Sequence, residues 1–355
     1  MRVLFLLGHP AHVHLFRNPI RLMQDEGHDI RIGCIEKEIT KDLLSHYGLP
    51  HVSIGPSQKD LLTKSLDTVR KDFRMVRLIK EFNPDIVVST GIPYAAHAAK
   101  LSGIPSIAFS DTEIATLVIK SMLPFVSAVC TPSCFSLDLG DKHVRYDGYH
   151  ELAYLHPDYF EPDKSILSEV GLQEGDSFFL VRFSSLDSSH DLGWRGVSAW
   201  GDDSLMRLLK DLEDFGRVFI MSELPLSQDL SKYVLRIPPH RLLDLLSFAR
   251  MYIGEGATMA SEAGVLGVPW MFVSKTDRGY LVDQEQRYGL GYHFTDAKKA
   301  REKAIELLED PQLHEKWKSR REKLLEEKVD VTKFIVDFVL GWPESFERMK
   351  VNGLL

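Results

Sequence analysis

The chain has 355 residues, of which 44% are hydrophobic and 26% are charged, and its formal net charge is −8. This length suits two domains of ordinary size, and the negative charge argues against broad nucleic-acid binding, which needs a basic face. The sequence contains no run of about 18 apolar residues, so we expect no membrane-spanning helix. The three cysteines, Cys34, Cys130 and Cys134, are too few for a disulfide framework and indicate a reducing cytoplasm.

Short apolar runs alternate with longer amphipathic segments, which is typical of parallel sheets covered by helices on both faces. Strands are predicted at residues 3–7, 30–34, 86–89, 106–108 and 128–131, with helices over 16–25 and 65–82. Prolines and acidic residues break the pattern between 149 and 176, and it then restarts with strands at 178–183, 218–221, 251–253 and 270–273. Helices are expected near 203–214, 242–248, 261–266, 298–308, 315–327 and 331–340.

The segment 252–274 is predicted to form a strand, a turn of small residues, a short helix, a second turn and a strand. Gly254 and Gly256 permit a tight turn, and Thr258 is expected to cap a helix over 259–266. The free N–H groups and the positive dipole end at such a helix start favour an anion such as a diphosphate. Glu262, one turn further on, carries a carboxylate suited to a ribose diol. The sequence therefore predicts a nucleotide-diphosphate cradle here.

Residues 254–269 resemble the nucleotide-sugar motif of the GT-B superfamily, in particular that of the peptidoglycan N-acetylglucosaminyltransferase and of UDP-N-acetylglucosamine 2-epimerase. Gly256, Ala257 and Thr258 stand where those enzymes place small residues against the pyrophosphate. Glu262 stands on their ribose-binding glutamate. The resemblance implies an α/β protein with two Rossmann-like, doubly wound domains facing a cleft. We place the acceptor-side domain at 1–160, joined by the C-terminal helix 331–355, and the nucleotide-sugar domain at 161–330.

Weaker similarities lie upstream of this motif. Residues 8–13 resemble the first-strand loop of the transferase, and 89–105 resemble its acceptor-side loop with the helix and strand that follow. Over most of its length the chain resembles the GT-B-like domain-of-unknown-function 354 family, which also shows the segments 111–113 and 189–191. The epimerase's Gly-Thr-Arg-Pro-Glu motif has no counterpart, and residues 182–185 replace the transferase's glycine-rich loop. Neither activity therefore follows residue by residue.

A GT-B transferase needs no metal motif, because helix N-termini and cationic side chains can stabilise the charge of a leaving diphosphate. The sequence has no Asp-x-Asp motif, and we expect neither a metal nor a cofactor, the nucleotide sugar being a substrate. Arg182 is the preferred diphosphate ligand because it ends a strand and its planar fork suits phosphate. Further cationic candidates, each with a surface or structural role as its alternative, are Arg195, Lys275 and Arg278. The resemblance implies sugar-hydroxyl contacts from the stretch after the last strand, where Asp283, Gln284 and Gln286 are the candidate partners.

The attacking hydroxyl must lose a proton, so a base is expected in the first domain. His12 is the first candidate because it follows the first strand, at the edge where ligands collect in parallel sheets, and its ordinary pKa suits the task. His9 and His14 are its rivals, and His14 is alternatively a packed or capping residue.

Two further groups of side chains could take part in the chemistry. Asp111 and Glu113 follow another strand and could form an acid/base pair or orient an acceptor sugar, whereas Asp111 or Thr112 could simply cap a helix. His190 lies in the polar loop 184–200 and is our candidate for a sugar or phosphate contact.

These features favour a cytoplasmic glycosyltransferase that uses a UDP-linked sugar to build a surface polysaccharide or glycan. A UDP-N-acetylglucosamine 2-epimerase-like isomerase or hydrolase and a non-catalytic nucleotide-sugar-binding protein are the alternatives. The expected partners are the nucleotide sugar and a sugar or lipid-linked glycan acceptor, but no nucleic acid. A peripheral contact with the inner face of the membrane, through residues 114–125, and a homodimer are both left open.

Overall fold

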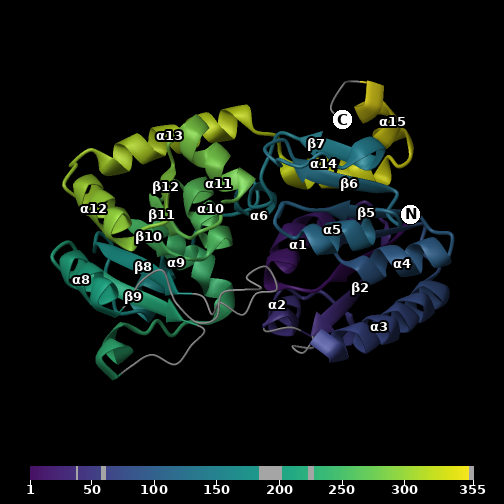
Figure 1. The fold of residues 1–355 in the computed structure, drawn as a ribbon, viewed down its shortest axis with the longest axis horizontal. Coiled ribbons are helices and arrows are strands. Elements are labelled where there is room, and N and C mark those ends of the chain that lie inside the picture. Colours follow the sequence, from purple (N-terminus) through teal and green to yellow (C-terminus); the bar gives the residue numbers. More distant parts are fainter. Residues whose placement is uncertain (37–38, 57–60, 184–201, 223–227, 352–355) are drawn as a thin grey trace. The chain divides into compact units, whose positions relative to one another are not determined.

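The computed structural model describes residues 1–36, 39–56, 61–183, 202–222 and 228–351. The chain divides into two compact units, one formed by residues 1–159 with 329–355 and the other by residues 160–328. The expected division placed these boundaries at residues 160 and 330. Each unit contains its own parallel sheet flanked by helices (Figure 1), and the predicted α/β class is confirmed.

Within the described part of the chain, the first unit has a seven-stranded parallel sheet in the order β3-β2-β1-β4-β5-β6-β7. The sequence pattern predicted all of these strands except β3 and β7. Both lie at an edge of the sheet, where one side meets no neighbouring strand, and their sequences, Val-Ser-Ile-Gly-Pro and His-Val-Arg-Tyr, are not continuous apolar runs. The strands are β1 (Arg2–Leu7), β2 (Asp29–Glu36), β3 (Val52–Pro56), β4 (Ile86–Thr90), β5 (Ser106–Phe109), β6 (Ala128–Pro132) and β7 (His143–Tyr146).

Alternating residues of β1 pack against different helices. Leu4 and Leu6 join the apolar cluster formed with α3 and α4, whereas Phe5 meets Phe16 of α1 with 5.3 Å between the ring centroids. The last long helix, α14, packs against α1 and α6, and Thr332 donates to the carbonyl of Ala153 at 2.6 Å. The helices of this unit are α1 (Pro10–Asp25), α2 (Thr40–His46), α3 (Leu61–Phe82), α4 (Pro93–Leu101), α5 (Thr116–Met122), α6 (Leu152–Leu155), α14 (Val331–Leu340) and α15 (Glu344–Val351).

The second unit has, among its described residues, a five-stranded parallel sheet in the order β12-β11-β10-β8-β9. Its strands are β8 (Phe178–Phe183), β9 (Arg217–Ser222), β10 (Met251–Gly254), β11 (Trp270–Val273) and β12 (Gly291–Phe294). Its helices are α7 (Ser165–Glu169), α8 (Asp202–Glu213), α9 (Leu242–Phe248), α10 (Ala257–Leu266), α11 (Gly279–Asp283), a π-helical turn (Gln284–Tyr288), α12 (Ala297–Leu308) and α13 (Leu313–Glu327). The prediction missed the edge strand β12.

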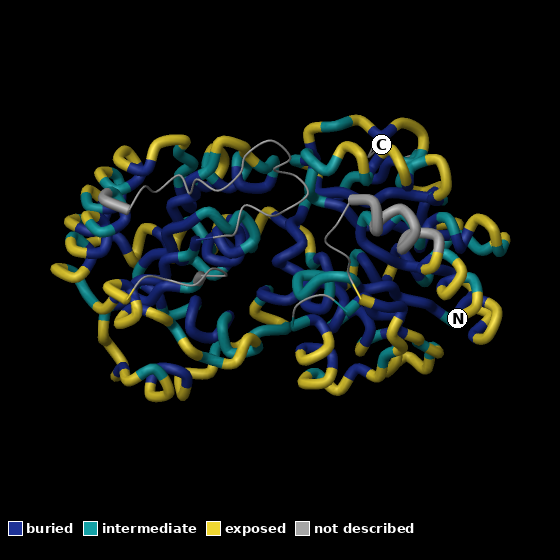
Figure 2. The backbone as a smooth tube through the Cα atoms, turned by 60° about the horizontal axis from the view of Figure 1, so that its bottom comes forward, coloured by how far each residue is buried: buried dark blue, intermediate teal, exposed yellow. Residues whose placement is uncertain are grey.

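The strands form the buried core of each unit, and exposed residues gather on the surrounding helices and loops (Figure 2). In the second unit, Trp270 is fully buried at the start of β11 and lies directly against Gly291 of β12. A Cβ atom at Gly291 would lie 2.0 Å from a ring carbon of Trp270, so this position has no room for a side chain. The close approach fixes β12 against β11.

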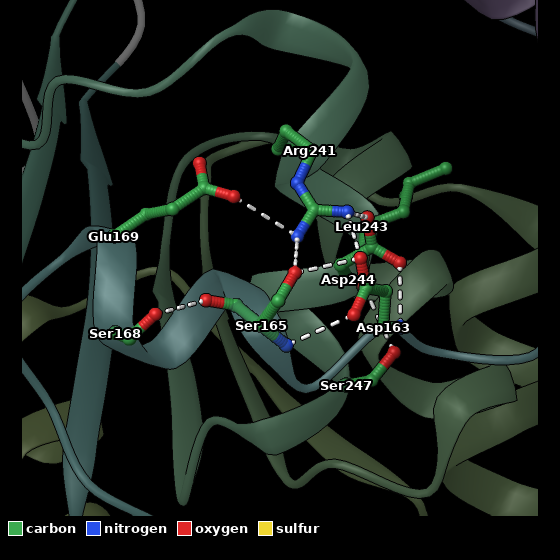
Figure 3. A network of polar contacts seen from close by, with 8 residues as sticks. All are labelled: Asp163, Ser165, Ser168, Glu169, Arg241, Leu243, Asp244 and Ser247. Atoms are coloured by element: carbon green, nitrogen blue, oxygen red, sulfur yellow. Dashed lines mark hydrogen bonds and ion pairs between the residues drawn. The ribbon is translucent and has the colours of Figure 1, made fainter.

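A polar network connects α7 to the start of α9 (Figure 3). Arg241 donates to Asp163 and to Asp244, both at 2.9 Å, and also reaches Ser165 and Glu169. Asp244 also accepts the backbone N–H of Asp163 at 3.0 Å. One guanidinium thus ties the first residues of the second unit to its helical layer.

Among the residues that the structure describes, none of the helices combines the length and the apolar character that crossing a membrane requires.

Candidate functional site

The predicted cradle lies in the second unit, at the end of β10. Helix α10 begins at Ala257, and Gly256 occupies the N-cap position with an extended backbone and no side-chain cap. Thr258 therefore lies in the first helical turn, and the prediction that it caps the helix is wrong. Ala257 and Thr258 can adopt helical geometry, so the helix starts as soon as the glycine turn allows. The first N–H groups of such a helix have no partner within it.

Arg182 lies beside this helix start. It pairs with Gly254 in the sheet, and its carbonyl accepts the N–H of Glu255 at 3.1 Å. A Cβ atom at Gly254 would lie 2.4 Å from the Arg182 carbonyl oxygen, and one at Gly256 would lie 3.2 Å from Arg182 Cδ. Gly254 thus allows the close approach of the two strand backbones, and Gly256 leaves room for the Arg182 side chain beside the first turn of α10. The structure brings together Arg182, Gly256, Ala257 and Thr258.

Tyr252 supports the glycine turn through a hydrogen bond to Gly256. Its side chain is fully buried, and its hydroxyl donates to the carbonyl of Gly256 at 3.1 Å. Burial raises the pKa of Tyr252, although the charge of Arg182 opposes the rise. Glu262 of α10 is buried and close enough to add to the increase. Tyr252 therefore remains a neutral donor that orients the Gly256 peptide, a role that the sequence did not reveal.

Gln284 does not lie where the resemblance placed it. Its side chain is fully buried, its Oε1 accepts from Trp270 Nε1 at 3.2 Å, and its Nε2 donates to Ser261 Oγ at 2.8 Å. The expected contact with a donor sugar is wrong, because this amide is enclosed in the core. Asp283 pairs with the buried Lys328 at 2.9 Å.

Two of the remaining cationic candidates, Lys275 and Arg278, lie in the loop after β11. Arg278 donates to Thr276 Oγ1 and to the carbonyl of Asp277 in its own loop, and Lys275 is exposed in the same loop. Arg195 and His190 lie outside the described residues.

In the first unit, His12 occupies the first turn of α1 rather than a loop. The helix begins earlier than predicted because His9 caps it, accepting the N–H of Ala11 at 3.2 Å, with Pro10 as the first helical residue. His12 Nδ1 accepts the N–H of Gly8 at 3.1 Å, and Thr90 Oγ1 lies 2.9 Å from both ring nitrogens.

His14 is excluded as a base. It is buried, and its Nδ1 lies 3.3 Å from Arg17 Nη1. Burial, followed by the charges of Arg17 and His9, lowers the pKa of His14 from 6.5 to about 3. Such an imidazole stays neutral near pH 7 and acts as a packing residue.

Asp111 follows β5 and lies against His150, which follows β7. Asp111 Oδ2 is 3.1 Å from His150 Nδ1, and Oδ1 accepts from Thr112 Oγ1 at 2.9 Å. Burial by itself raises the pKa of Asp111, but His150 and the hydrogen bonds from His150 and Thr112 outweigh it and, with His12, bring the pKa down to about 2. Helix α5 starts after Ala115 without a side-chain cap. The alternative that Asp111 or Thr112 caps a helix is therefore wrong.

Other polar groups surround this pair. Glu113 is buried, and its Oε1 accepts the N–H of Ser136 at 3.3 Å. His150 Nε2 and the hydroxyl of Tyr146 are buried and have no hydrogen-bond partner among the residues that the structure describes, and burial and the charge of Asp111 raise the pKa of Tyr146. The sequence did not single out His150, because β7 was not predicted and the position after it could not be seen as a strand end. The signal that could have found it is the polar run after this edge strand.

Within the described ranges, no group of three or more His, Cys, Asp or Glu side chains is placed to hold a metal ion. In the second unit, the start of α10 at Gly256, with Arg182 beside it, has the chemistry to bind an anion. The first unit contributes carboxylates and imidazoles at the carboxyl ends of β1, β5 and β7. An anion site and a set of proton-exchanging groups are what a group transfer from a phosphorylated donor requires.

The fold is shared with solved structures of a glycosyl-group transferase and of UDP-GlcNAc 2-epimerases. The spinosyn forosaminyltransferase SpnP is 17% identical, with a TM-score of 0.64 and 99% of each chain covered. The UDP-GlcNAc 2-epimerase from Neisseria meningitidis, solved with UDP-GlcNAc bound, is 16% identical, with a TM-score of 0.68, 96% of this chain and 100% of that chain covered. These likenesses establish a GT-B-like fold, as predicted.

Sequence comparison leads to the family. The uncharacterized protein MJ0665 of Methanocaldococcus jannaschii is 22% identical over 274 residues, which cover 74% of this chain and 79% of that protein. The model of the family described as "Protein of unknown function (DUF354)" matches residues 2–343. The chain belongs to the DUF354 family, and its fold is that of GT-B glycosyltransferases and UDP-GlcNAc 2-epimerases.

Proposed function

We propose that the protein is a glycosyltransferase that takes a UDP-linked sugar as donor, works without a metal ion, and acts in the synthesis of a surface polysaccharide or glycan. The observation that carries this proposal is the start of α10, where Gly256 leaves the helix uncapped and Arg182 passes alongside. Free N–H groups, a helix dipole and a guanidinium together suit a diphosphate. Glu262 supplies the carboxylate for the ribose.

In the proposed reaction, the acceptor hydroxyl attacks the anomeric carbon of the donor. A bond forms between the acceptor oxygen and that carbon, the bond from the carbon to the diphosphate oxygen breaks, and UDP leaves with the electron pair. Arg182 and the helix N-terminus stabilise the charge that develops on the diphosphate. The hydroxyl proton passes to a base of the first unit.

The epimerase-like reaction is the second candidate, and the buried Glu113 close in sequence to Asp111 favours it. Removing and returning a proton at one sugar carbon needs an acid and a base, and two nearby carboxyl groups in different environments could fill these roles. The lack of the epimerase's Gly-Thr-Arg-Pro-Glu motif in this sequence keeps the transferase reaction in first place.

The test combines binding and turnover. Calorimetry should show UDP binding to the full chain, and Glu262→Gln should weaken it, while Glu302→Gln, on the exposed face of α12, should not. Release of UDP from UDP-sugars that depends on an added sugar or lipid-linked acceptor supports the transferase. Formation of an epimer from UDP-GlcNAc alone would replace it by the second candidate. Unchanged UDP affinity in Glu262→Gln would contradict the nucleotide cradle itself.

A further inference from the structure

We propose that His150 is the proton acceptor of the first unit, prepared by Asp111, and that His12 acts beside it as a hydrogen-bond donor. The inference rests on the proposed transfer function and deepens it, because it assigns the base that the reaction needs. It reverses the expectation from sequence, in which His12 was the base.

Asp111 imposes the Nδ1–H tautomer on His150. A carboxylate can only accept, so the 3.1 Å contact between Asp111 Oδ2 and His150 Nδ1 places a hydrogen on Nδ1. In a neutral ring, Nε2 then carries the lone pair. Thr112 holds the other oxygen of Asp111 at 2.9 Å, which fixes the carboxylate in place. This is the orientation in which a carboxylate readies an imidazole to take a proton and stabilises the imidazolium that forms.

His150 Nε2 has no hydrogen-bond partner in the described part of the chain. It is buried, and it is one of the polar side-chain atoms of the described residues that lack a hydrogen bond. An unsatisfied buried polar atom costs free energy, and such atoms call for a functional explanation. The lone pair that the tautomer leaves on Nε2 therefore meets no hydrogen-bond donor among the described residues. The hydroxyl of Tyr146 is also buried and has no hydrogen-bond partner among the described residues. Burial and the negative charge of Asp111 raise the pKa of this hydroxyl.

His12 has the opposite tautomer, because its Nδ1 accepts a hydrogen bond where that of His150 donates one. The N–H of Gly8 donates to His12 Nδ1 at 3.1 Å, and a backbone N–H cannot accept in return. The neutral ring of His12 therefore carries its hydrogen on Nε2. A second proton could enter only at Nδ1, and it would have to displace the hydrogen bond from Gly8. His12 is thus better suited to donate than to take up the acceptor proton.

The charges around the pair are consistent with this assignment. Against the effect of burial, the charges of His150 and His12 both lower the pKa of Asp111, which keeps this carboxylate ionised at neutral pH. Burial, together with the charge of Asp111, raises the pKa of Tyr146, so its hydroxyl stays neutral. In the transfer step, the proton of the acceptor hydroxyl moves to His150 Nε2 as the glycosidic bond forms. Asp111 keeps its negative charge and stabilises the new imidazolium.

The kinetic test compares substitutions in the full chain. His150→Asn keeps a donor for Asp111 but has no lone pair at the position of Nε2, and we expect kcat to fall about 100- to 10,000-fold. The KM for the UDP-sugar should stay unchanged, because the donor cradle belongs to the second unit. His97→Asn is the matched control, since His97 also faces a carboxylate, that of Asp72, at 3.4 Å. Its kcat should equal that of the natural chain. Full activity in His150→Asn, with activity lost in His12→Asn, would overturn the assignment.

A measurement without turnover separates this inference from the proposed function. In histidine labelled with ¹⁵N, we expect neutral His150 to show the Nδ1–H tautomer and neutral His12 the Nε2–H tautomer. Asp111→Ala should release His150 from that tautomer while the rest of the spectrum is retained. A neutral His150 with its proton on Nε2 would refute the inference whether or not the enzyme is active. If no acceptor supports UDP release, the proposed transfer function is refuted. The measured tautomer of His150 still shows whether Asp111 and His150 form the proposed pair.

Discussion

The replacement of Arg182 by methionine tests the chemistry of the cradle most directly. A methionine keeps much of the apolar length of the side chain and removes the guanidinium that passes the first turn of α10. The arginine is close enough for a Cβ at Gly256 to meet its Cδ at 3.2 Å, so a diphosphate at the helix start would be within its reach. A hydrogen bond to a charged group contributes about 1.5–3 kcal/mol. The dissociation constant for UDP should therefore rise about 10- to 150-fold.

Isothermal titration calorimetry with UDP and with uridine gives the decisive comparison. Uridine has no phosphate, so its affinity should be the same in Arg182→Met and in the natural chain. Glu262→Gln should weaken both ligands, because the ribose is common to them. Arg217→Met is the matched control: Arg217 begins β9, and its side chain donates to the carbonyls of Val170 and Gly171. An equal loss of affinity for UDP and uridine in Arg182→Met would refute a diphosphate contact and indicate a distorted glycine turn.

Three further predictions concern stability. Gly264→Ala places a Cβ 2.0 Å from Gln284 Oε1 in a filled core, and urea denaturation should show a loss of about 1–3 kcal/mol in the free energy of unfolding. Arg241→Met leaves the largely buried Asp244 carboxylate without its ion-pair partner, and the same measurement should show a loss of about 1–3 kcal/mol. The unfolded chain binds a proton at His14 near pH 6.5 and the folded chain only near pH 3. Stability should therefore be complete above the higher value and fall as the pH drops towards the lower one, by up to about 1.4 kcal/mol per pH unit, and His14→Gln should reduce this slope.

The first two of these predictions have matched controls, and the third has an outcome that would contradict it. A Cβ at Gly91 would meet its nearest neighbour at 3.5 Å, an ordinary contact, so Gly91→Ala should be nearly neutral. Lys164→Met breaks only an exposed ion pair with Glu174 and should change stability by less than about 1 kcal/mol. Equal effects of Arg241→Met and Lys164→Met would contradict the role of the network in Figure 3. An unchanged pH slope in His14→Gln would show that another group titrates on unfolding.

Most elements could be predicted because their signals are local. The interior strands β1, β4 and β10 are continuous apolar runs, and a buried parallel strand can hardly have another pattern. The edge strands β3, β7 and β12 escaped prediction because polar residues, glycine or proline interrupt their apolar runs, whereas the edge strand β9 has a continuous run and was predicted. The start of α1 was misplaced for a related reason. His9 acts as its cap, a role that a sequence pattern assigns more readily to Ser, Thr, Asp or Asn.

The sequence by itself determined the α/β class and the glycine turn before α10, since backbone conformation and helix polarity depend on residues adjacent in the chain. Only the tertiary structure showed that Arg182 passes Gly256, that Gln284 is enclosed, and that Asp111 pairs with His150. These residues come from different strands and loops, and the order of strands in the sheet decides which of them meet. Hydrogen bonds between residues that follow different strands also set the tautomers of the histidines. These contacts cannot be read from the spacing of residues along the chain.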